Sequence, residues 1–410
     1  MQTEITEALL NTTQGKEADA ILRSCVHCGF CLATCPTYQL VGDELDSPRG
    51  RIYLIKQVLE GETPTQKTQS HLDRCLTCRA CESTCPSGVQ YGRLVDIGRE
   101  LVEERVSRSL PDRLLRSSLR YVLPRSGLFN SLLALGRVAR PALPQVLKDK
   151  IPLKGNAGSW PTTTHTRKML LLDGCVQPGM APNINSATAR VMDKLGVTLV
   201  RADKVGCCGA ISHHLNAQEE ALGYVKRNID AWWPHIEAGA EAIVVTASGC
   251  GTMLQEYGHL LQHDSAYASK AVRVSERFRD VSQVVSAEQN RLTDLLKKST
   301  KKNGEKIAFH APCSLQHGLK LKNIVEPLLS AAGFTLTSVP DAHLCCGSAG
   351  TYSILQPELS KQLLKNKVAA LESGAPDLIA TANIGCLTHI ESGSSTNVKH
   401  WIEILDERLA

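Results

Sequence analysis

One cysteine pattern occurs twice near the start of this 410-residue chain and constrains its fold more than any other feature. Each copy has the spacing Cys-x-x-Cys-x-x-Cys-x-x-x-Cys-Pro. The first three thiols of a copy lie on one tight loop, whereas the fourth is displaced by a wider gap and turned away before proline. The thiols are Cys25, Cys28, Cys31 and Cys35 in the first copy, and Cys75, Cys78, Cys81 and Cys85 in the second.

This spacing is the one with which bacterial-type ferredoxins hold two 4Fe–4S clusters. We therefore predict two clusters whose ligand sets cross between the copies. Zinc also accepts four thiolates, but zinc modules usually bring their cysteines in separated pairs, so the third cysteine of each run is surplus to them. The pattern favours iron–sulfur clusters and electron transfer. We assign cluster 1 to Cys25, Cys28, Cys31 and Cys85, and cluster 2 to Cys35, Cys75, Cys78 and Cys81.

The composition limits the classes of protein to which the chain can belong. Its 16 cysteines accompany a polar N-terminus without the apolar core of a signal peptide, so we expect metal sites in a cytoplasmic protein rather than disulfides. No stretch approaches the roughly 18 apolar residues of a membrane span, so contact with the cytoplasmic face of the inner membrane would be peripheral. The net charge of +5 is modest and gives no indication of nucleic-acid binding.

The chain divides into four regions. Residues 1–104 hold the cysteine runs, residues 105–165 form a connector, and two α/β domains are expected over residues 166–300 and 301–410. The connector combines scattered leucines with an excess of basic residues, which predicts short amphipathic helices. Such helices could lie on an anionic membrane or dock on an acidic partner, although a plain packed linker has the same pattern.

A helix is also predicted between the two cysteine runs. It begins at Pro48, with Ser47 as its cap. Arg49 and Arg51 lie near both runs in the sequence and could offset the negative charge of thiolate-ligated iron. Solvated residues at the end of a helix would have the same pattern, and the sequence does not separate the two interpretations.

The rest of the chain contains an internal repeat. Its copies are offset by 138 positions at three cysteines and by 136 at a fourth, which indicates duplication. Apolar runs alternate with helical stretches in both copies, so we predict two α/β domains with parallel sheets, and an α+β multidomain fold for the whole chain. The expected strands are residues 169–172, 197–200 and 242–245 in the first copy, and 307–309, 334–337 and 378–380 in the second.

Each copy of the repeat carries four cysteines just beyond the predicted strand ends. Because functional groups collect at the carboxyl edge of a parallel sheet, we expect each set to form one pocket. Four soft ligands suit an iron–sulfur cluster or another metal, adjacent cysteines also suit redox-active thiols, and a single buried cysteine can be a small hydrophobe. The sets are Cys175, Cys207, Cys208 and Cys250, and Cys313, Cys345, Cys346 and Cys386.

The glycine-flanked cysteine pairs resemble those of CCG domains. These domains occur in heterodisulfide reductases, in an anaerobic glycerol-3-phosphate dehydrogenase subunit and in a lactate-utilisation protein. A twin-cluster ferredoxin followed by two such domains is most similar to the iron–sulfur subunits of bacterial glycolate oxidases. The likeness covers nearly the whole chain and is weakest in the connector. Five stretches carry it, at residues 33–58, 71–78, 228–234, 343–352 and 381–386.

The chain departs from the fuller CCG pattern, which ends each domain in Cys-x-x-Cys. Met253 and His389 occupy the positions of the last cysteines. Four thiols per domain remain, one fewer than the non-cubane clusters of heterodisulfide reductases use, so the resemblance does not carry that cluster type over. The second domain could hold an ordinary 4Fe–4S cube with His389 nearby, and the first could be similar or empty. Weaker candidate ligands are His213, His214, His310, His317 and His343.

The resemblance also implies partners and a role. The chain has no dinucleotide fingerprint and no base–nucleophile pair, so we expect no substrate-oxidation site in it. In the family that the resemblance indicates, separate FAD subunits convert glycolate to glyoxylate. This chain would relay their electrons through its clusters toward a quinone or another acceptor, with Cys207, Cys208, Cys345 and Cys346 on the exit side. The alternatives are a subunit of a lactate-utilisation or glycerol-3-phosphate dehydrogenase complex, thiol–disulfide chemistry, and a zinc-stabilised scaffold.

Overall fold

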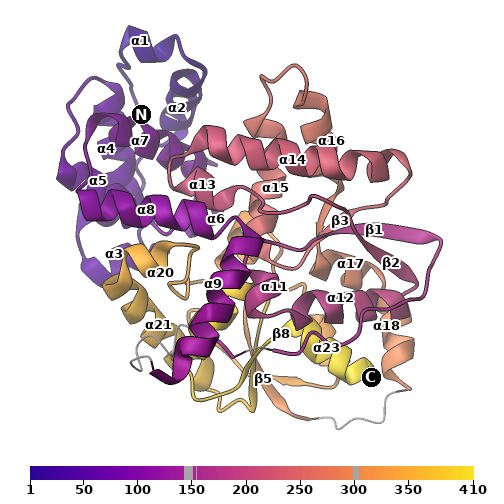
Figure 1. Cartoon of the computed structure of the whole chain (residues 1–410). Coiled ribbons are helices and arrows are strands. Elements are labelled where there is room, and N and C mark those ends of the chain that lie inside the picture. The colour runs from indigo at the N-terminus through magenta and orange to yellow at the C-terminus, as the bar shows by residue number, and fades with distance from the viewer. Residues whose placement is uncertain (143–150, 154, 299–303) are drawn as a thin grey trace.

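The computed structural model describes residues 1–142, 151–153, 155–298 and 304–410. It contains a helical N-terminal part, two connector helices and two α/β halves that each hold one parallel sheet (Figure 1). The predicted α+β multidomain fold is confirmed. Part of the predicted connector (143–150 and 154) and the predicted boundary between the halves at residues 300 and 301 lie outside the described residues.

The N-terminal part is built from short helices around a single apolar core. Leu22, Ile55 and Leu94 are fully buried where α2, α4 and α7 meet. Gly98 of α7 allows the close approach, since a Cβ there would lie 2.5 Å from Cγ1 of Ile55. The helices are α1 (Glu7–Leu10), α2 (Thr13–Ser24), α3 (Pro36–Val41), η1 (Glu44–Asp46), α4 (Pro48–Leu59), α5 (Gln66–Asp73), α6 (Ala80–Thr84) and α7 (Tyr91–Arg105).

Helix α4 begins where the sequence predicts. The Ser47 hydroxyl accepts a hydrogen bond of 2.9 Å from the backbone N–H of Gly50, and Pro48 occupies the first turn. Glycine is required at position 50, because a Cβ there would lie 2.0 Å from the carbonyl oxygen of Glu44. The cap and the glycine together let η1 pack closely against the start of α4, where Arg51 lies.

The connector forms two helices, α8 (Leu110–Val122) and α9 (Ser126–Ala139), followed by the single turn η2 (Arg140–Ala142). Neither α8 nor α9 has a buried residue. Five of their leucines are exposed, whereas Leu119, Leu128 and Leu133 are half-buried. The start of α8 is fixed by Arg108, which pairs with Asp73 at 2.6 Å and with Glu103. Within the described residues, no helix has the length and apolar character needed to span a bilayer.

The first α/β half has a four-stranded parallel sheet in the order β2-β1-β3-β4. Alternate residues of β1 face opposite sides: Met169 and Leu171 pack with α12 and α17, whereas Leu170 and Leu172 pack with α14 and α15. The elements are β1 (Arg167–Leu172), α11 (Gln177–Met180), α12 (Asn183–Lys194), β2 (Val197–Arg201), α13 (Ala210–His214), α14 (Gln218–Glu237), β3 (Ile243–Val245), α15 (Ser248–Leu260), α16 (Ala268–Arg277), β4 (Phe278–Asp280), α17 (Val281–Ala287) and α18 (Gln289–Leu296).

The second half repeats this topology in the order β6-β5-β7-β8, again with every pair parallel. The equal strand order supports the duplication that the cysteine spacing indicates. The elements are β5 (Lys306–His310), η3 (Ser314–Gly318), α19 (Glu326–Ala331), β6 (Thr335–Leu336), α20 (Tyr352–Leu355), α21 (Pro357–Glu372), β7 (Leu378–Thr381), α22 (Ile384–Glu391), β8 (Val398–His400) and α23 (Trp401–Leu409).

Each sheet has a fourth strand that the sequence analysis did not identify. These strands, β4 and β8, are only three residues long and pair with β3 and β7. The six predicted strands are present, with small shifts at their ends. Three residues are too few to show a period of two, so sequence patterning cannot separate such a strand from a loop.

The two halves share one core, and the N-terminal helices lie against both (Figure 1). Helices α12 and α23 pack together, and Nε2 of His400 lies 3.0 Å from the Thr246 carbonyl oxygen at the junction of the halves. The hydroxyl oxygens of Ser248 and Ser314 are 2.7 Å apart, so the loops that follow β3 and β5 meet. The cysteine-bearing edges of both sheets are thereby held in fixed positions.

Candidate iron–sulfur sites

Two cavities in the N-terminal part are lined by the eight cysteines of the two runs. With the open solvent at their mouths included, the two spaces measure about 450 Å³ and about 300 Å³. The first is lined by Cys25, Cys28, Cys31 and Cys85, with Cys81 also on its wall. The second is lined by Cys35, Cys75, Cys78 and Cys81.

The grouping of the thiols follows the crossed pattern. The fourth cysteine of each run lines the cavity formed by the first three of the other run. Cys81 lines both cavities, so the two adjoin, which the spacing alone does not indicate. Thiolates converging on adjoining spaces are the donor set that paired 4Fe–4S clusters require. The individual ligand assignments to clusters 1 and 2 stay a prediction.

Left-handed backbone conformations curve both cysteine loops. His27 and Gly29 in the first run, and Thr77 and Arg79 in the second, have φ between 52° and 85°. Such a conformation is costly for a β-branched residue such as Thr77, and it persists only where the surroundings fix it. Arg99 does so here, because its guanidinium donates to Oγ1 of Thr77 at 2.9 Å and to the carbonyl oxygen of Cys75 at 2.7 Å.

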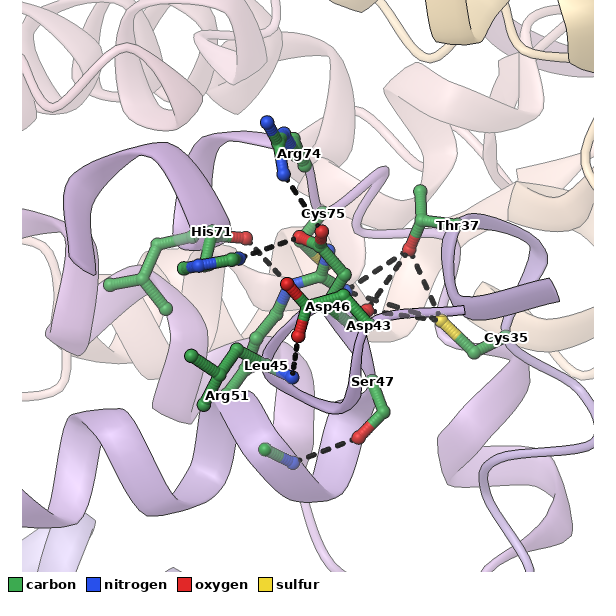
Figure 2. Close-up of polar contacts among 12 residues, drawn as sticks. Cys35, Thr37, Asp43, Leu45, Asp46, Ser47, Arg51, His71, Arg74 and Cys75 are labelled. Carbon is green, nitrogen blue, oxygen red and sulfur yellow. Dashed lines mark hydrogen bonds and ion pairs between the residues drawn. The ribbon is translucent and has the colours of Figure 1, made fainter. Parts of the chain in front are cut away.

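A buried arginine, Arg51, lines the second cavity, and Figure 2 shows its polar contacts. Arg51 is 1% exposed and donates to the carbonyl oxygen of His71 at 2.7 Å and to Oγ1 of Thr37 at 3.2 Å. Its Nη1 lies 4.0 Å from Sγ of Cys35. Burial opposes its charge, but nearby anionic groups, with Cys75 first among them, outweigh burial and raise the pKa of Arg51 further.

Asp46 organises the charges around this arginine. Its carboxylate is fully buried and accepts from Arg51 at 3.2 Å and from Arg74 at 2.9 Å, and Nδ1 of His71 lies 3.1 Å away (Figure 2). Sequence reasoning did not identify Asp46, His71 or Arg74 as functional. The stretch that contains His71 and Arg74 entered only as part of the resemblance, and nothing in its pattern indicates a buried ion network.

The two arginines near the clusters therefore differ. Arg51 is the buried charge beside the second cavity, whereas Arg49 lines the first cavity but is partly exposed and pairs with Glu44 at 2.8 Å. A hydroxyl also reaches the second cavity: Tyr91 donates to Sγ of Cys75 at 3.6 Å. Because donors and positive charge favour the more negative state of a cluster, these groups suit a centre that accepts electrons.

The four thiols of the first α/β half are brought together. Cys175, Cys207 and Cys208 are buried, and Cys250 is partly buried. Hydrogen bonds from Cys175 and Cys208 hold the pKa of Cys207 well below its usual range, with the backbone N–H of Gly209 at 3.4 Å from the same sulfur. The set therefore forms one connected thiol cluster, as expected from the strand ends.

The four thiols of the second half also meet. Sγ of Cys313 lies 3.8 Å from Sγ of Cys345, and the backbone N–H of Gly347 lies 3.4 Å from the Cys345 sulfur. Cys346 and Cys386 form a compact group with His310, in which the three potential ligand atoms lie within 4.8 Å of one another. The second half thus adds a histidine to its thiols.

The other histidines near the cysteines have different partners. Nε2 of His389 lies 3.1 Å from the Ser360 hydroxyl, and Nδ1 of His317 lies 3.0 Å from the Ser83 hydroxyl. His213 and His214 lie beside Asp96 of α7. Three of these histidines, His213, His214 and His317, thus contact residues of the N-terminal part rather than thiols.

The second cavity of the N-terminal part adjoins the thiols of the second half. Burial raises the pKa of Cys78, and negative charge on the neighbouring Cys313 raises it further. Leu76 packs in one apolar cluster with Cys345 and Tyr352. The Tyr352 hydroxyl donates to the carbonyl oxygen of Arg74 at 3.1 Å, across the same junction.

Charged pairs join the N-terminal part to the first half instead. Glu256 of α15 accepts from Arg79 at 3.1 Å and from Arg93 at 2.9 Å. Asp96 lies 3.3 Å from Nε2 of His213. Burial opposes ionisation of Asp96, but its bonds with the two histidines outweigh burial and hold the pKa of Asp96 well below its usual range.

Comparisons with known proteins agree with this architecture. A family model described as a 4Fe-4S dicluster domain matches residues 21–89, and a model described as a cysteine-rich domain, CCG, matches residues 169–255 and 307–391. These matches cover the two cysteine loops and both sheet edges. The iron–sulfur character predicted from the cysteine spacing is confirmed.

Full-length relatives specify the family further. The glycolate oxidase iron-sulfur subunit of Escherichia coli is 56% identical over all of this chain and 99% of the relative. A probable glycolate oxidase iron-sulfur subunit of Bacillus subtilis is 31% identical over 91% of this chain and 89% of the relative. Lactate utilization protein A of Anoxybacillus flavithermus is 27% identical over only 55% of this chain. The chain therefore belongs to the family of glycolate oxidase iron–sulfur subunits.

Proposed function

We propose that the chain relays electrons from an FAD subunit that oxidises glycolate to glyoxylate toward a quinone. The observation that carries this proposal is the continuity of its thiol sites: the two cysteine cavities adjoin at Cys81, and the second adjoins the second α/β half at Cys78 and Cys313. Flavins accept two electrons from a hydroxy acid, whereas iron–sulfur clusters carry one at a time, so a chain of adjoining clusters suits the second task.

The entry side is proposed at cluster 1. Cys28 is exposed on its loop, and the neighbouring Val26 and Phe30 are 67% and 63% exposed. Large apolar side chains beside an exposed cluster ligand suit a protein interface. A flavoprotein seated there would bring its cofactor near the first cavity.

The exit side is proposed at Cys345 and Cys346 of the second half. Sγ of Cys345 lies 3.8 Å from Sγ of Cys313, and Cys313 packs in the same cluster as Cys78 of the second cavity. Cys207 and Cys208 were expected on the exit side by the same pattern. Cys207 packs with Cys175 and Tyr224. The first half, which holds these thiols, contacts the N-terminal part through charged pairs rather than through thiols.

Replacing Cys75 by alanine tests the relay. In the assembled complex, Cys75→Ala should remove the electron paramagnetic resonance (EPR) signal of cluster 2, leave cluster 1 and leave the flavin reducible by glycolate. Turnover with a quinone should be lost. The matched change Cys25→Ala should remove cluster 1 instead. If either variant assembles yet loses flavin reduction by glycolate, the relay role is wrong.

We also propose a peripheral membrane contact through α8 and α9. Leu114 of α8 and Leu135 and Val138 of α9 are 69%, 65% and 80% exposed. Arg113 of α8 and Arg125, the residue before α9, are exposed too. Apolar and basic side chains on one surface suit an anionic bilayer. Leu114→Ser with Leu135→Ser should reduce flotation with vesicles containing anionic lipid, whereas Val272→Ser on α16 should not. Equal flotation of all three proteins contradicts the proposal.

The lactate-utilisation alternative has a direct test. The relatives of that name match little more than half of this chain. Purification of the native complex should therefore recover an FAD subunit that is reduced by glycolate in preference to lactate. Recovery of a flavoprotein reduced only by lactate favours the alternative.

A further inference from the structure

The two halves differ at one position next to their cysteines. Strand β1 ends at Leu172, three residues before Cys175, and β5 ends at His310, three residues before Cys313. The two positions differ by 138, as the cysteines do, and each lies at the end of the equivalent strand. Leu172 packs in the apolar core of the first half, whereas an imidazole takes that place in the second.

His310 is buried without a polar partner. It is 1% exposed, and among the described residues it is the only histidine whose two ring nitrogens both lack access to water and a hydrogen-bond partner. Burying an imidazole in this way is unfavourable unless something satisfies a ring nitrogen. Its backbone carbonyl is satisfied by Oγ1 of Thr381 at 3.2 Å, so only the ring is left without a partner.

The atoms nearest to this ring are thiols. A ring nitrogen of His310 lies within 4.8 Å of the sulfur atoms of Cys346 and Cys386, which also lie within that distance of each other. Separations of this size suit ligands that share a metal centre, since each ligand bond is about 2.0–2.3 Å long. Nδ2 of Asn383 lies 3.6 Å from the Cys386 sulfur, as a donor to a thiolate would.

Competing histidines are already occupied. His389 takes the place of the last CCG cysteine in the sequence, but its Nε2 is bonded to Ser360. Nε2 of His317 lies 2.9 Å from the carbonyl oxygen of His343, and its Nδ1 faces Ser83. Among the histidines that the structure describes, only His310 has both ring nitrogens unpartnered and lies within 4.8 Å of the thiols.

We propose that His310 is one of the four ligands of a 4Fe–4S cluster in the second half, together with three of its four thiolates, Cys346 and Cys386 among them. The first half, with Leu172, offers thiolates alone. This inference deepens the proposed relay, because the cluster would be the centre that follows cluster 2. A neutral imidazole adds no negative charge to a cluster, so this centre should have a higher potential than an all-thiolate one, as histidine-ligated clusters do. Electrons would then move toward it from cluster 2.

Nitrogen hyperfine spectroscopy on the anaerobically purified full-length chain tests the ligand. The reduced protein should show a strongly coupled imidazole nitrogen, which changes on labelling with ¹⁵N-histidine. His310→Leu should remove the coupling and lower iron from about twelve to about eight per chain. His389→Leu, which removes the histidine three residues after Cys386, should change neither. His310→Cys should keep the iron, lose the coupling and lower the potential of the centre.

Each other outcome overturns the ligand role. Coupling that persists in His310→Leu, or wild-type protein with iron in the two N-terminal clusters only, contradicts it. Zinc in place of iron in the second half also contradicts it. Unchanged EPR signals from clusters 1 and 2 in His310→Leu verify folding of that variant. Results that contradict the ligand role of His310 do not contradict the relay, which Cys75→Ala tests independently, so the two proposals can fail separately.

Discussion

The buried guanidinium of Arg51 should set the reduction potential of cluster 2. Its Nη1 lies 4.0 Å from Sγ of Cys35, and Asp46, its one carboxylate partner within the described part of the chain, is shared with Arg74. Asp46 therefore does not cancel the charge of Arg51 alone. Replacing Arg51 by methionine keeps much of the side-chain volume and removes the charge, which should make the cluster harder to reduce.

The size of the effect follows from the distance. At about 4 Å and an effective dielectric constant of about 20, one unit charge is worth about 4 kcal/mol, or about 170 mV for one electron. The added electron is spread over the cluster and lies farther from the guanidinium than the sulfur does. We therefore expect a fall on the order of 80 mV for Arg51→Met.

The assay is a redox titration of cluster 2 followed by EPR. Arg49→Met is the matched control, because Arg49 is partly exposed and paired with Glu44, so solvent should reduce its effect. Arg51→Lys retains the charge and should shift the potential less than Arg51→Met. If Arg51→Met retains its iron and its potential stays within about 20 mV of the wild-type value, electrostatic control by this residue is refuted.

Three further outcomes are expected. Arg51→Met should also lower the free energy of unfolding by about 3 kcal/mol, since it leaves one fewer partner for the buried Asp46; an unchanged denaturation midpoint contradicts this. The Asp96–His213 pair should stabilise the docking of α7 on α13 between about pH 4 and 6.5, and this contribution should fade as pH rises through the raised pKa of His213 or falls through the lowered pKa of Asp96. The difference in melting temperature between wild type and Asp96→Asn should accordingly be largest near pH 5.5 and shrink as pH rises through the raised pKa of His213, and a difference independent of pH would count against the pair. Gly98→Ala should cost about 1–3 kcal/mol in urea unfolding because its Cβ meets Ile55, whereas Gly127→Ala on α9, with open space around it, should not destabilise.

Sequence patterning predicted the features that repeat or have a fixed spacing. The crossed cysteine runs, the duplicated strands and the Ser47 cap all depend on local intervals, and the structure reproduces those intervals in space. The ion network around Asp46 could not be predicted, because it joins residues up to 28 positions apart whose types are common on surfaces. His310 was among the weaker candidates, since nearness in sequence to a cysteine does not reveal whether a ring is partnered.

Duplication gives a reason to treat the differences between the halves as functional. Two copies of one domain begin with equal surfaces and equal pockets, so changes near the retained cysteines mark where their roles separated.

The first half meets the N-terminal helices through ion pairs, at Glu256 and at His213, which fix orientation. The second half meets them through apolar side chains and thiols, with Cys78 beside Cys313 and Tyr352 over Arg74. A contact that must carry electrons benefits from adjoining ligands and exclusion of water, whereas a contact that only positions the domains needs neither. The distribution of contacts therefore supports our proposal that the first half positions the N-terminal helices and the second half carries the electrons. Exchanging Leu172 and His310 between the halves should not exchange these proposed roles, because the interfaces would remain where they are.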